Sequence, residues 1–119
     1  MKRDPRLYID DIVEAVNRIE EYAEGLSFEA FKKDRKTVDA IVRNFEIIGE
    51  ATKRIHVEIK EKYPQISWRM MAGTRDKLIH EYFGVNLEVL WKAVNEDVPP
   101  LKRSIEELLT EMDKEFQQQ

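Results

Sequence analysis

The sequence predicts an all-α protein, a four-to-five-helix antiparallel bundle. Glycine and proline number only four each among 119 residues, and 37% of the residues are charged, a composition typical of helices. Apolar residues recur at spacings of three and four, the helical period, and no segment alternates like a strand. Without a linker or an internal repeat, we expect one domain over residues 1–119.

The N-terminal part of the chain predicts one long helix and then a short helical turn. Asp4 followed by Pro5 is typical of an N-cap and a first helical residue, and Gly25 is placed to end this helix at about residue 24. Ser27 is a second capping residue, and the turn after it carries phenylalanines at positions 28 and 31. The apolar face of the long helix consists of Tyr8, Ile12, Ala15, Val16, Ile19, Tyr22 and Ala23.

The longest periodic segment, residues 36–62, predicts a single helix that ends at Tyr63-Pro64. Gly49 lies on its apolar face, where a glycine costs roughly 1 kcal/mol relative to alanine, so we expect another helix to approach closely there. His56 follows one turn after Thr52, and we expect it to be partly buried and hydrogen-bonded. The apolar face consists of Val38, Ile41, Val42, Phe45, Ile48, Thr52, Ile55 and Ile59.

Capping residues and a proline pair divide the rest of the chain. Ser67 precedes a predicted helix over residues 68–83, which Gly84 ends, and Asn86 precedes the next helix. The pair Pro99-Pro100 predicts an interruption, with Asp97 as a candidate cap for the helix that resumes. The apolar positions of this last part are Leu87, Leu90, Trp91, Val94, Leu101, Ile105, Leu108, Leu109 and Met112.

Charge and cysteine content limit the classes of function. There are 20 Lys and Arg against 24 Asp and Glu, which argues against a broad basic surface for nucleic acid but leaves a local basic cleft open. The absence of cysteine excludes disulfides, a thiolate nucleophile and a thiolate metal site. The N-terminus has no apolar signal segment, and no apolar run approaches the roughly 18 residues of a membrane span. We therefore expect a soluble, cytoplasmic protein.

The segment GTRDKLIHEYFG, residues 73–84, gathers Arg75, His80 and Tyr82 within a short stretch. The arginine fork matches phosphate oxygens, and histidine exchanges protons near neutral pH. Tyrosine can stack on a base, donate a hydrogen bond or accept a modification. Together they suit RNA cleavage, in which His80 would move the proton of the 2′-hydroxyl and Arg75 would stabilise the phosphoryl oxygens. The pattern requires neither a metal nor a cofactor.

A straight helix does not bring these three side chains together. Arg75 and Tyr82 are two turns apart on nearly one face, whereas His80 is about 140° round from Arg75. Either the helix deforms near Gly73-Thr74, or a second copy supplies the missing group by two-fold symmetry. The spacing also leaves an ordinary structural interpretation open, with Arg75 in a surface ion pair, His80 hydrogen-bonded and partly buried, and Tyr82 in the core.

The motif RDKLIHEY resembles the R-x-x-x-x-H-x-Y signature of the HEPN superfamily, and in particular its HepT-like toxins. The longer block ISWRMMAGTRDKLIHEYFGVN, residues 66–86, and the earlier block NFEIIGEATKRI, residues 44–55, resemble that branch in the same order. The resemblance implies a HEPN-like helical homodimer with both motifs in a shared cleft, and a metal-independent endoribonuclease. It further implies a toxin neutralised by a small nucleotidyltransferase-fold antitoxin, which transfers AMP from ATP to the motif tyrosine.

Carried over residue by residue, the resemblance makes Arg75 and His80 catalytic, Asp76 a supporting polar neighbour and Tyr82 the acceptor of AMP. The rival interpretation is a non-catalytic helical module that docks a nucleotidyltransferase partner or a nucleotide, because binding and cleaving a phosphate use the same residue types. A third is a structural dimer in which the motif has no function.

Other candidate residues have two interpretations each. The clusters KKDRK (32–36) and TKR (52–54) would flank an RNA path or form solvated faces. Glu46 and Glu50 would hold a cation or form a charged helix face. The two tryptophans, Trp68 and Trp91, are expected in the core or an interface rather than as base-stacking platforms. Met70-Met71 would give adaptable packing at a dimer or partner surface.

Overall fold

The structure is a computed structural model, and it describes residues 3–73 and 86–117. Every regular element within these residues is helical, which confirms the all-α prediction. No helix in the described part of the chain is long and apolar enough to cross a membrane. In chain order the elements are α1 (Pro5–Ala23), α2 (Phe28–Lys33), α3 (Arg35–Arg54), α4 (Val57–Lys62), helical turns at 68–73, α6 (Leu87–Lys92), the π-helical turn η2 (Ala93–Asp97) and α7 (Val98–Gln117).

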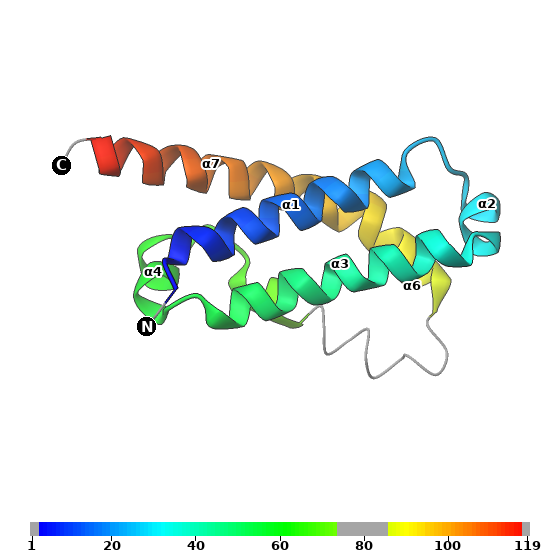
Figure 1. Ribbon diagram of the computed structural model, residues 1–119, viewed down its shortest axis with the longest axis horizontal. Helices are drawn as coiled ribbons and strands as arrows, with labels where there is room; N and C mark the ends of the chain where they lie inside the picture. The colour runs from blue at the N-terminus through cyan, green and yellow to red at the C-terminus, as the bar shows by residue number, and fades with distance from the viewer. Residues whose placement is uncertain (1–2, 74–85, 118–119) are drawn as a thin grey trace.

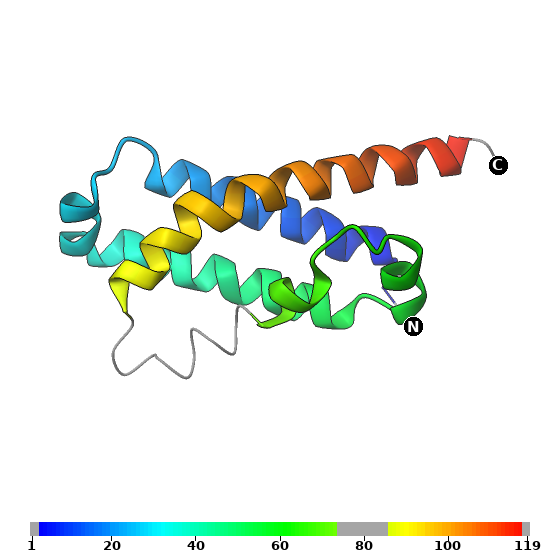
Figure 2. The ribbon, with the colours of Figure 1, turned by 180° about the vertical axis from the view of Figure 1, so that it is seen from behind.

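Three long helices form the body of the molecule, which is elongated, at 50 × 28 × 24 Å. Figure 1 shows α1 running antiparallel to both α3 and α7, and α1 packs against both. The short helix α2 joins α1 to α3 at one end of the bundle, while α4 and the N-terminus lie at the other end (Figure 1). Seen from behind, α6 and η2 lead obliquely into α7 across the bundle (Figure 2).

The predicted start and end of α1 are confirmed. The Asp4 side chain accepts a hydrogen bond from the Arg6 backbone N–H at 2.9 Å, and Pro5 is the first helical residue. Gly25 adopts a φ of 76°, in the left-handed region that favours glycine. Ser27 caps α2 as predicted, because its Oγ accepts a hydrogen bond from the Ala30 N–H at 3.1 Å.

The prediction of one continuous helix over residues 36–62 is wrong. Helix α3 ends at Arg54, Ile55 adopts extended dihedral angles (φ −71°, ψ 130°), and α4 begins after His56. The Thr52 hydroxyl donates to the Ile48 carbonyl at 2.6 Å, a local bond that competes with a regular helix and tends to bend it. Ile55 nevertheless stays buried and Ile59 packs on the core, so the apolar spacing persists across the break.

His56 has a different role from the one predicted. Its side chain is exposed rather than partly buried. The predicted hydrogen bond is present, because Nδ1 accepts a bond from the Glu58 backbone N–H at 3.3 Å. His56 is therefore the N-cap of α4.

The predicted interruption at Pro99-Pro100 is also wrong, and Asp97 is not a helix cap but the last residue of η2. The Val98 N–H donates to the Ala93 carbonyl, five residues back, so the chain passes from α6 to α7 through a π-helical turn. Helix α7 then begins at Val98 without a break in the helical path, and both prolines lie in its first turn, directly after the π-helical turn.

Most of the apolar positions predicted from periodicity are buried, and all the helices except α4 contribute fully buried or nearly buried side chains to the core. Trp68 is buried and Trp91 is half-buried against the core, as predicted. Gly49 is buried within α3. The largest fully buried side chains are Phe31, Ile9, Ile12, Ile19, Ile41, Ile48, Met71, Leu90, Ile105, Leu108, Val16 and Val98.

Candidate functional site

The residues predicted for catalysis and modification, Arg75, Asp76, His80 and Tyr82, lie in residues 74–85, outside the described residues. Their mutual geometry, and the helix predicted over 68–83 beyond residue 73, therefore stay predictions. The structure does describe the chain on both sides of this segment, and these two flanks are held in different ways.

The flank before the segment is anchored in the core. The Trp68 indole is buried, and its Nε1–H donates to the Tyr63 carbonyl at 2.9 Å. The Met71 N–H bonds the Ser67 carbonyl at 3.0 Å, which closes the first helical turn after Ser67. The Met71 side chain is fully buried, whereas Met70 is 47% exposed. One methionine of the pair thus packs inside and the other faces outward beside the candidate site.

The flank after the segment begins with the predicted cap. The Asn86 Oδ1 accepts hydrogen bonds from the backbone N–H groups of Glu88 at 3.1 Å and Val89 at 3.3 Å. Leu90 is fully buried one turn later. The Trp91 ring lies 4.7 Å from the Phe31 ring between centroids, which ties α6 to α2. The chain therefore rejoins the bundle at a fixed position.

A hollow of about 450 Å³ lies between these flanks, and we call it the flank hollow. Apolar side chains form most of its walls, and Lys92 and Asp97 are its charged members. Such walls suit a nucleobase or an apolar side chain better than a bare phosphate. Its lining residues are Phe45 and Ile48 of α3, Met70 and Gly73 of the first flank, and Val89, Leu90, Lys92, Ala93, Asp97, Val98 and Leu101 after the segment.

Of the two interpretations of Glu46 and Glu50, the structure favours the charged helix face. Glu46 pairs with Arg43, with 3.5 Å between Oε2 and Nη1. Within residues 3–73 and 86–117, no group of three or more His, Asp or Glu side chains is arranged to hold a metal ion.

The basic cluster at 32–36 contains a structural cap. The Asp34 Oδ1 accepts from the Thr37 N–H at 3.1 Å, and Oδ2 accepts from the Thr37 hydroxyl at 2.7 Å. These hydrogen bonds, the hydroxyl first, lower the pKa of the Asp34 carboxyl. Lys32 pairs with Glu29 at 3.4 Å. Part of this cluster therefore serves the start of α3.

Polar contacts also hold α4 to the C-terminal part of α7. Lys62 Nζ lies 2.6 Å from the Glu115 carboxylate, and hydrogen bonding, with Lys62 the strongest partner, lowers the pKa of Glu115. Burial raises the pKa of the Tyr63 hydroxyl, and the nearby Glu115 carboxylate raises it further. These pKa shifts are explained by the structural contact between α4 and α7.

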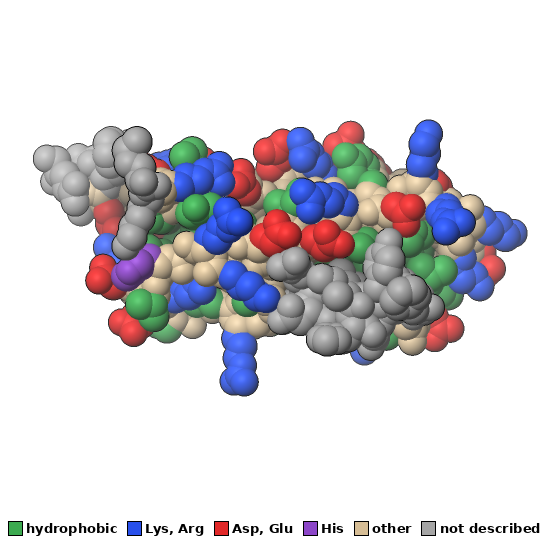
Figure 3. All heavy atoms as spheres, turned by 60° about the horizontal axis from the view of Figure 1, so that its bottom comes forward, with side chains coloured by type: hydrophobic (Ala, Val, Ile, Leu, Met, Phe, Trp, Pro, Cys, Tyr) green, Lys and Arg blue, Asp and Glu red, His purple; other side chains and the backbone are tan. Residues whose placement is uncertain are grey.

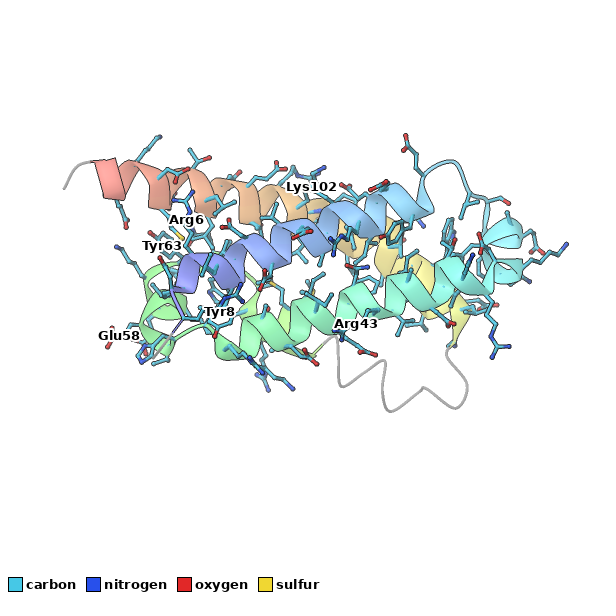
Figure 4. All side chains as sticks on the ribbon, in the orientation of Figure 1. Arg6, Tyr8, Arg43, Glu58, Tyr63 and Lys102 are labelled. Atoms are coloured by element: carbon cyan, nitrogen blue, oxygen red, sulfur yellow. The ribbon has the colours of Figure 1, made fainter. Side chains whose placement is uncertain are left out.

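A second hollow, of about 630 Å³, lies at the end of the bundle where α4 and the N-terminus meet, and sequence reasoning missed it. We call it the terminal hollow, and it is lined by Arg3, Pro5, Tyr8, Arg54, His56, Glu58 and Ile59. Figure 4 shows Tyr8 of α1 and Glu58 of α4 at this end. In the sequence, only the basic cluster at 52–54 pointed to this hollow, because the two segments that line it are far apart in the chain.

Comparison with known proteins identifies the family. The HepT-like ribonuclease family matches residues 12–108, a span that includes the motif and both flanks. The chain is 52% identical over 108 residues to a protein of Thermococcus cleftensis named "Probable ribonuclease HepT", covering 91% of this chain and 98% of that protein.

More distant relatives agree with this assignment. A protein of Methanocaldococcus jannaschii, named as a candidate RNase, is 41% identical over 114 residues, which cover 96% of this chain and 94% of its own length. A protein of Caldanaerobacter subterraneus subsp. tengcongensis, also named as a candidate RNase, is 42% identical over 107 residues, which cover 90% of this chain and 96% of that protein. No solved structure gives a significant match. The matched span and these identities show that the chain belongs to the HepT-like ribonuclease family.

Proposed function

We propose that this chain is a metal-independent endoribonuclease of the cytoplasm and the toxin of a toxin–antitoxin pair, with Arg75 and His80 as its catalytic residues. The observation that carries the proposal is the family match, because residues 12–108 include the whole R-x-x-x-x-H-x-Y motif. The names of three relatives, each a ribonuclease or a candidate one, support the same activity.

The chemistry follows from the residue types. His80 takes the proton of a ribose 2′-hydroxyl, whose oxygen attacks the adjacent phosphorus. The bond from phosphorus to the 5′-oxygen breaks, and that oxygen receives the proton back from His80. Arg75 stabilises the charge on the phosphoryl oxygens, and Asp76 supports the arginine. The products are a 2′,3′-cyclic phosphate, or the 3′-phosphate after its hydrolysis, and a 5′-hydroxyl.

The active form is a homodimer in this proposal. On a straight helix His80 is about 140° round from Arg75, so a second copy completes the site unless the helix deforms. The exposed Met70 side chain beside the apolar flank hollow supports an interface on this side of the molecule.

In this proposal the antitoxin inhibits the enzyme by modifying Tyr82. A nucleotidyltransferase antitoxin transfers AMP from ATP to the tyrosine hydroxyl and releases pyrophosphate. The added phosphate is an anion on the same helical face as Arg75, so it pairs with the arginine and repels an RNA phosphate.

A cleavage assay with the purified chain tests the proposal. Arg75→Ala and His80→Ala are expected to abolish cleavage of RNA while their circular dichroism spectra stay unchanged. Arg69→Ala is the matched control, because Arg69 is an exposed arginine on the first flank. Cleavage should persist in EDTA and leave cyclic or 3′-phosphate ends. Equal cleavage by His80→Ala and the unsubstituted chain would refute the catalytic assignment, and binding of RNA or nucleotide without any cleavage would favour the non-catalytic module.

Intact mass tests the control step. The chain co-expressed with the neighbouring nucleotidyltransferase gene should gain mass in units of AMP, and Tyr82→Phe should not. The modified protein should cleave RNA more slowly than the unmodified one. Absence of any gain in mass would replace covalent control by simple binding of the partner.

A further inference from the structure

The terminal hollow is lined by arginine, tyrosine and histidine side chains that are not part of the catalytic segment. The chain segment entering α1 supplies Arg3, α1 itself supplies Tyr8, the last residue of α3 is Arg54, and the cap of α4 is His56. These residues come from two parts of the sequence that meet only because α1 packs antiparallel on α3 (Figure 1).

Two guanidinium groups line this hollow. Arg54 is exposed, and in residues 3–73 and 86–117 no ion pair joins it to a carboxylate. The Arg3 guanidinium lies 4.8 Å from the Tyr8 ring centroid and 2.6 Å from the Asp11 carboxylate. Arg3 is thus held in place against an aromatic ring, whereas the guanidinium N–H groups of Arg54 can donate hydrogen bonds to a ligand.

His56 adds a hydrogen-bond donor to the hollow. Its Nδ1 accepts the Glu58 backbone N–H at 3.3 Å, so in the neutral ring the proton lies on Nε2. An Nε2–H donor beside Arg54 suits a phosphate oxygen. Figure 3 shows Lys and Arg side chains interspersed with Asp and Glu side chains over one face of the molecule.

The acidic groups around the hollow limit what it can bind. Asp11 is paired with Arg3, the Asp4 side chain caps α1, and Glu58 lines the wall. This mixed charge disfavours a highly charged free anion. It suits one phosphodiester unit, which carries a single negative charge, together with a base that stacks on an aromatic ring.

We propose that the terminal hollow binds one nucleotide of a single-stranded RNA, with the phosphate held by Arg54, Arg3 and His56 and the base against the Tyr8 ring. This inference rests on the proposed ribonuclease function, for which it supplies a second contact to the substrate. Both hollows involve α3, and Arg54 lies six residues beyond Ile48 of the flank hollow, about 9 Å along the helix axis.

Binding of a fluorescent 2′-O-methyl oligonucleotide, which lacks the attacking hydroxyl and cannot be cleaved, tests the proposal by anisotropy. Arg54→Ala is expected to weaken binding about fivefold and to reduce the slope of log Kd against log salt by about 0.7, the loss of one phosphate contact to a single strand. Arg35→Ala is the matched control, because Arg35 is an exposed arginine at the first position of the same helix. Its Kd should stay within about twofold of the unsubstituted value.

The ring is tested separately. Tyr8→Leu removes the stacking face and should weaken binding about fivefold or more, whereas Tyr8→Phe keeps the face and should bind as before. Thermal melting of each variant checks that the fold survives, because Tyr8 packs against the core. AMP should not displace the oligonucleotide at equal concentration; displacement would assign the hollow to a free nucleotide and overturn the RNA proposal.

The outcomes separate this inference from the proposed function. If the 2′-hydroxyl RNA of the same sequence is cleaved but Arg54→Ala and Tyr8→Leu bind like the unsubstituted chain, the inference is wrong and the ribonuclease stands. If RNA stays intact but the predicted losses of binding appear, the inference stands and the ribonuclease is wrong. Equal weakening by Arg35→Ala would mean a general effect of charge, and it would also overturn the inference.

Discussion

Replacing both Pro99 and Pro100 with alanine should slightly lower the stability of the protein rather than raise it. A proline inside a regular α-helix costs about 3 kcal/mol, so a strained pair would release up to about 6 kcal/mol on replacement. The structure argues against such strain. Helix α7 begins at Val98, the preceding π-helical turn gives the Val98 N–H a bond to the Ala93 carbonyl, and both prolines lie in the first turn.

Without strain to release, the double replacement changes stability mainly through the unfolded chain. Exchanging a proline for alanine gives the unfolded chain more freedom and costs about 0.4–1 kcal/mol per site, or about 1–2 kcal/mol for the pair. For a chain of 119 residues, 1 kcal/mol corresponds to about 4 °C in Tm. The double variant should therefore melt about 4–8 °C lower.

Thermal unfolding followed by circular dichroism measures this shift, at one fixed protein concentration because a dimer's Tm depends on it. Pro5→Ala is the matched control, since Pro5 is the first residue of α1 and its replacement should show the effect of one unstrained proline. A Tm of the double variant above that of the unsubstituted chain would refute the reasoning, because it would mean that the prolines strain the helix.

Three further predictions follow from polar contacts. Trp68→Phe removes the bond from Nε1 to the Tyr63 carbonyl and should cost about 1–2 kcal/mol in urea unfolding, and an unchanged midpoint would contradict an anchoring role for the indole. Thr37→Val should raise the Asp34 pKa toward its usual value in an NMR titration. Because the folded-state pKa of Asp34 is depressed, its stabilisation is present above the unfolded pKa of about 3.9 and is lost as the pH falls below it. The loss of stability on acidification should thus be smaller in the variant, and an equal loss would contradict this cause. Glu115→Gln should lower the raised pKa of Tyr63 in an ultraviolet titration without restoring the usual value, because burial is the larger cause.

The parts of the fold that the sequence predicted correctly depend on nearby residues. The cap at Asp4, the glycine at position 25 and the caps at Ser27 and Asn86 act within about three positions of themselves, so their patterns suffice. The core followed from the helical period, because a buried face requires apolar side chains at that spacing.

The two wrong predictions concern backbone paths that the apolar pattern does not distinguish. Ile55 and Ile59 reach the core from a helix, a turn and a second helix, with the same spacing as one continuous helix. At Pro99-Pro100 the helical direction continues because η2 accommodates the pair, and the Asn95 side chain bonds the Trp91 carbonyl at 2.9 Å. Each outcome depends on local hydrogen bonds that spacing does not specify.

The candidate site also has a part that the sequence could predict and a part that depends on three-dimensional structure. The motif could be recognised from residue types and order alone, whereas the convergence of Arg75, His80 and Tyr82 depends on three-dimensional geometry and stays a prediction. The terminal hollow itself could not be predicted from the basic cluster at 52–54, because Tyr8 and Arg54 share no local pattern and meet only through the packing of α1 on α3.

The break at Ile55 and the terminal hollow are physically connected. On a continuous helix Arg54 and His56, two positions apart, would point about 200° away from each other. The extended dihedral angles of Ile55 turn the chain between them, and both side chains line one hollow. The same turn lets Ile55 remain buried, so the core does not lose its side chain. The departure from a regular helix therefore has little cost to the core, and it is the step that places an arginine and a histidine beside the Tyr8 ring.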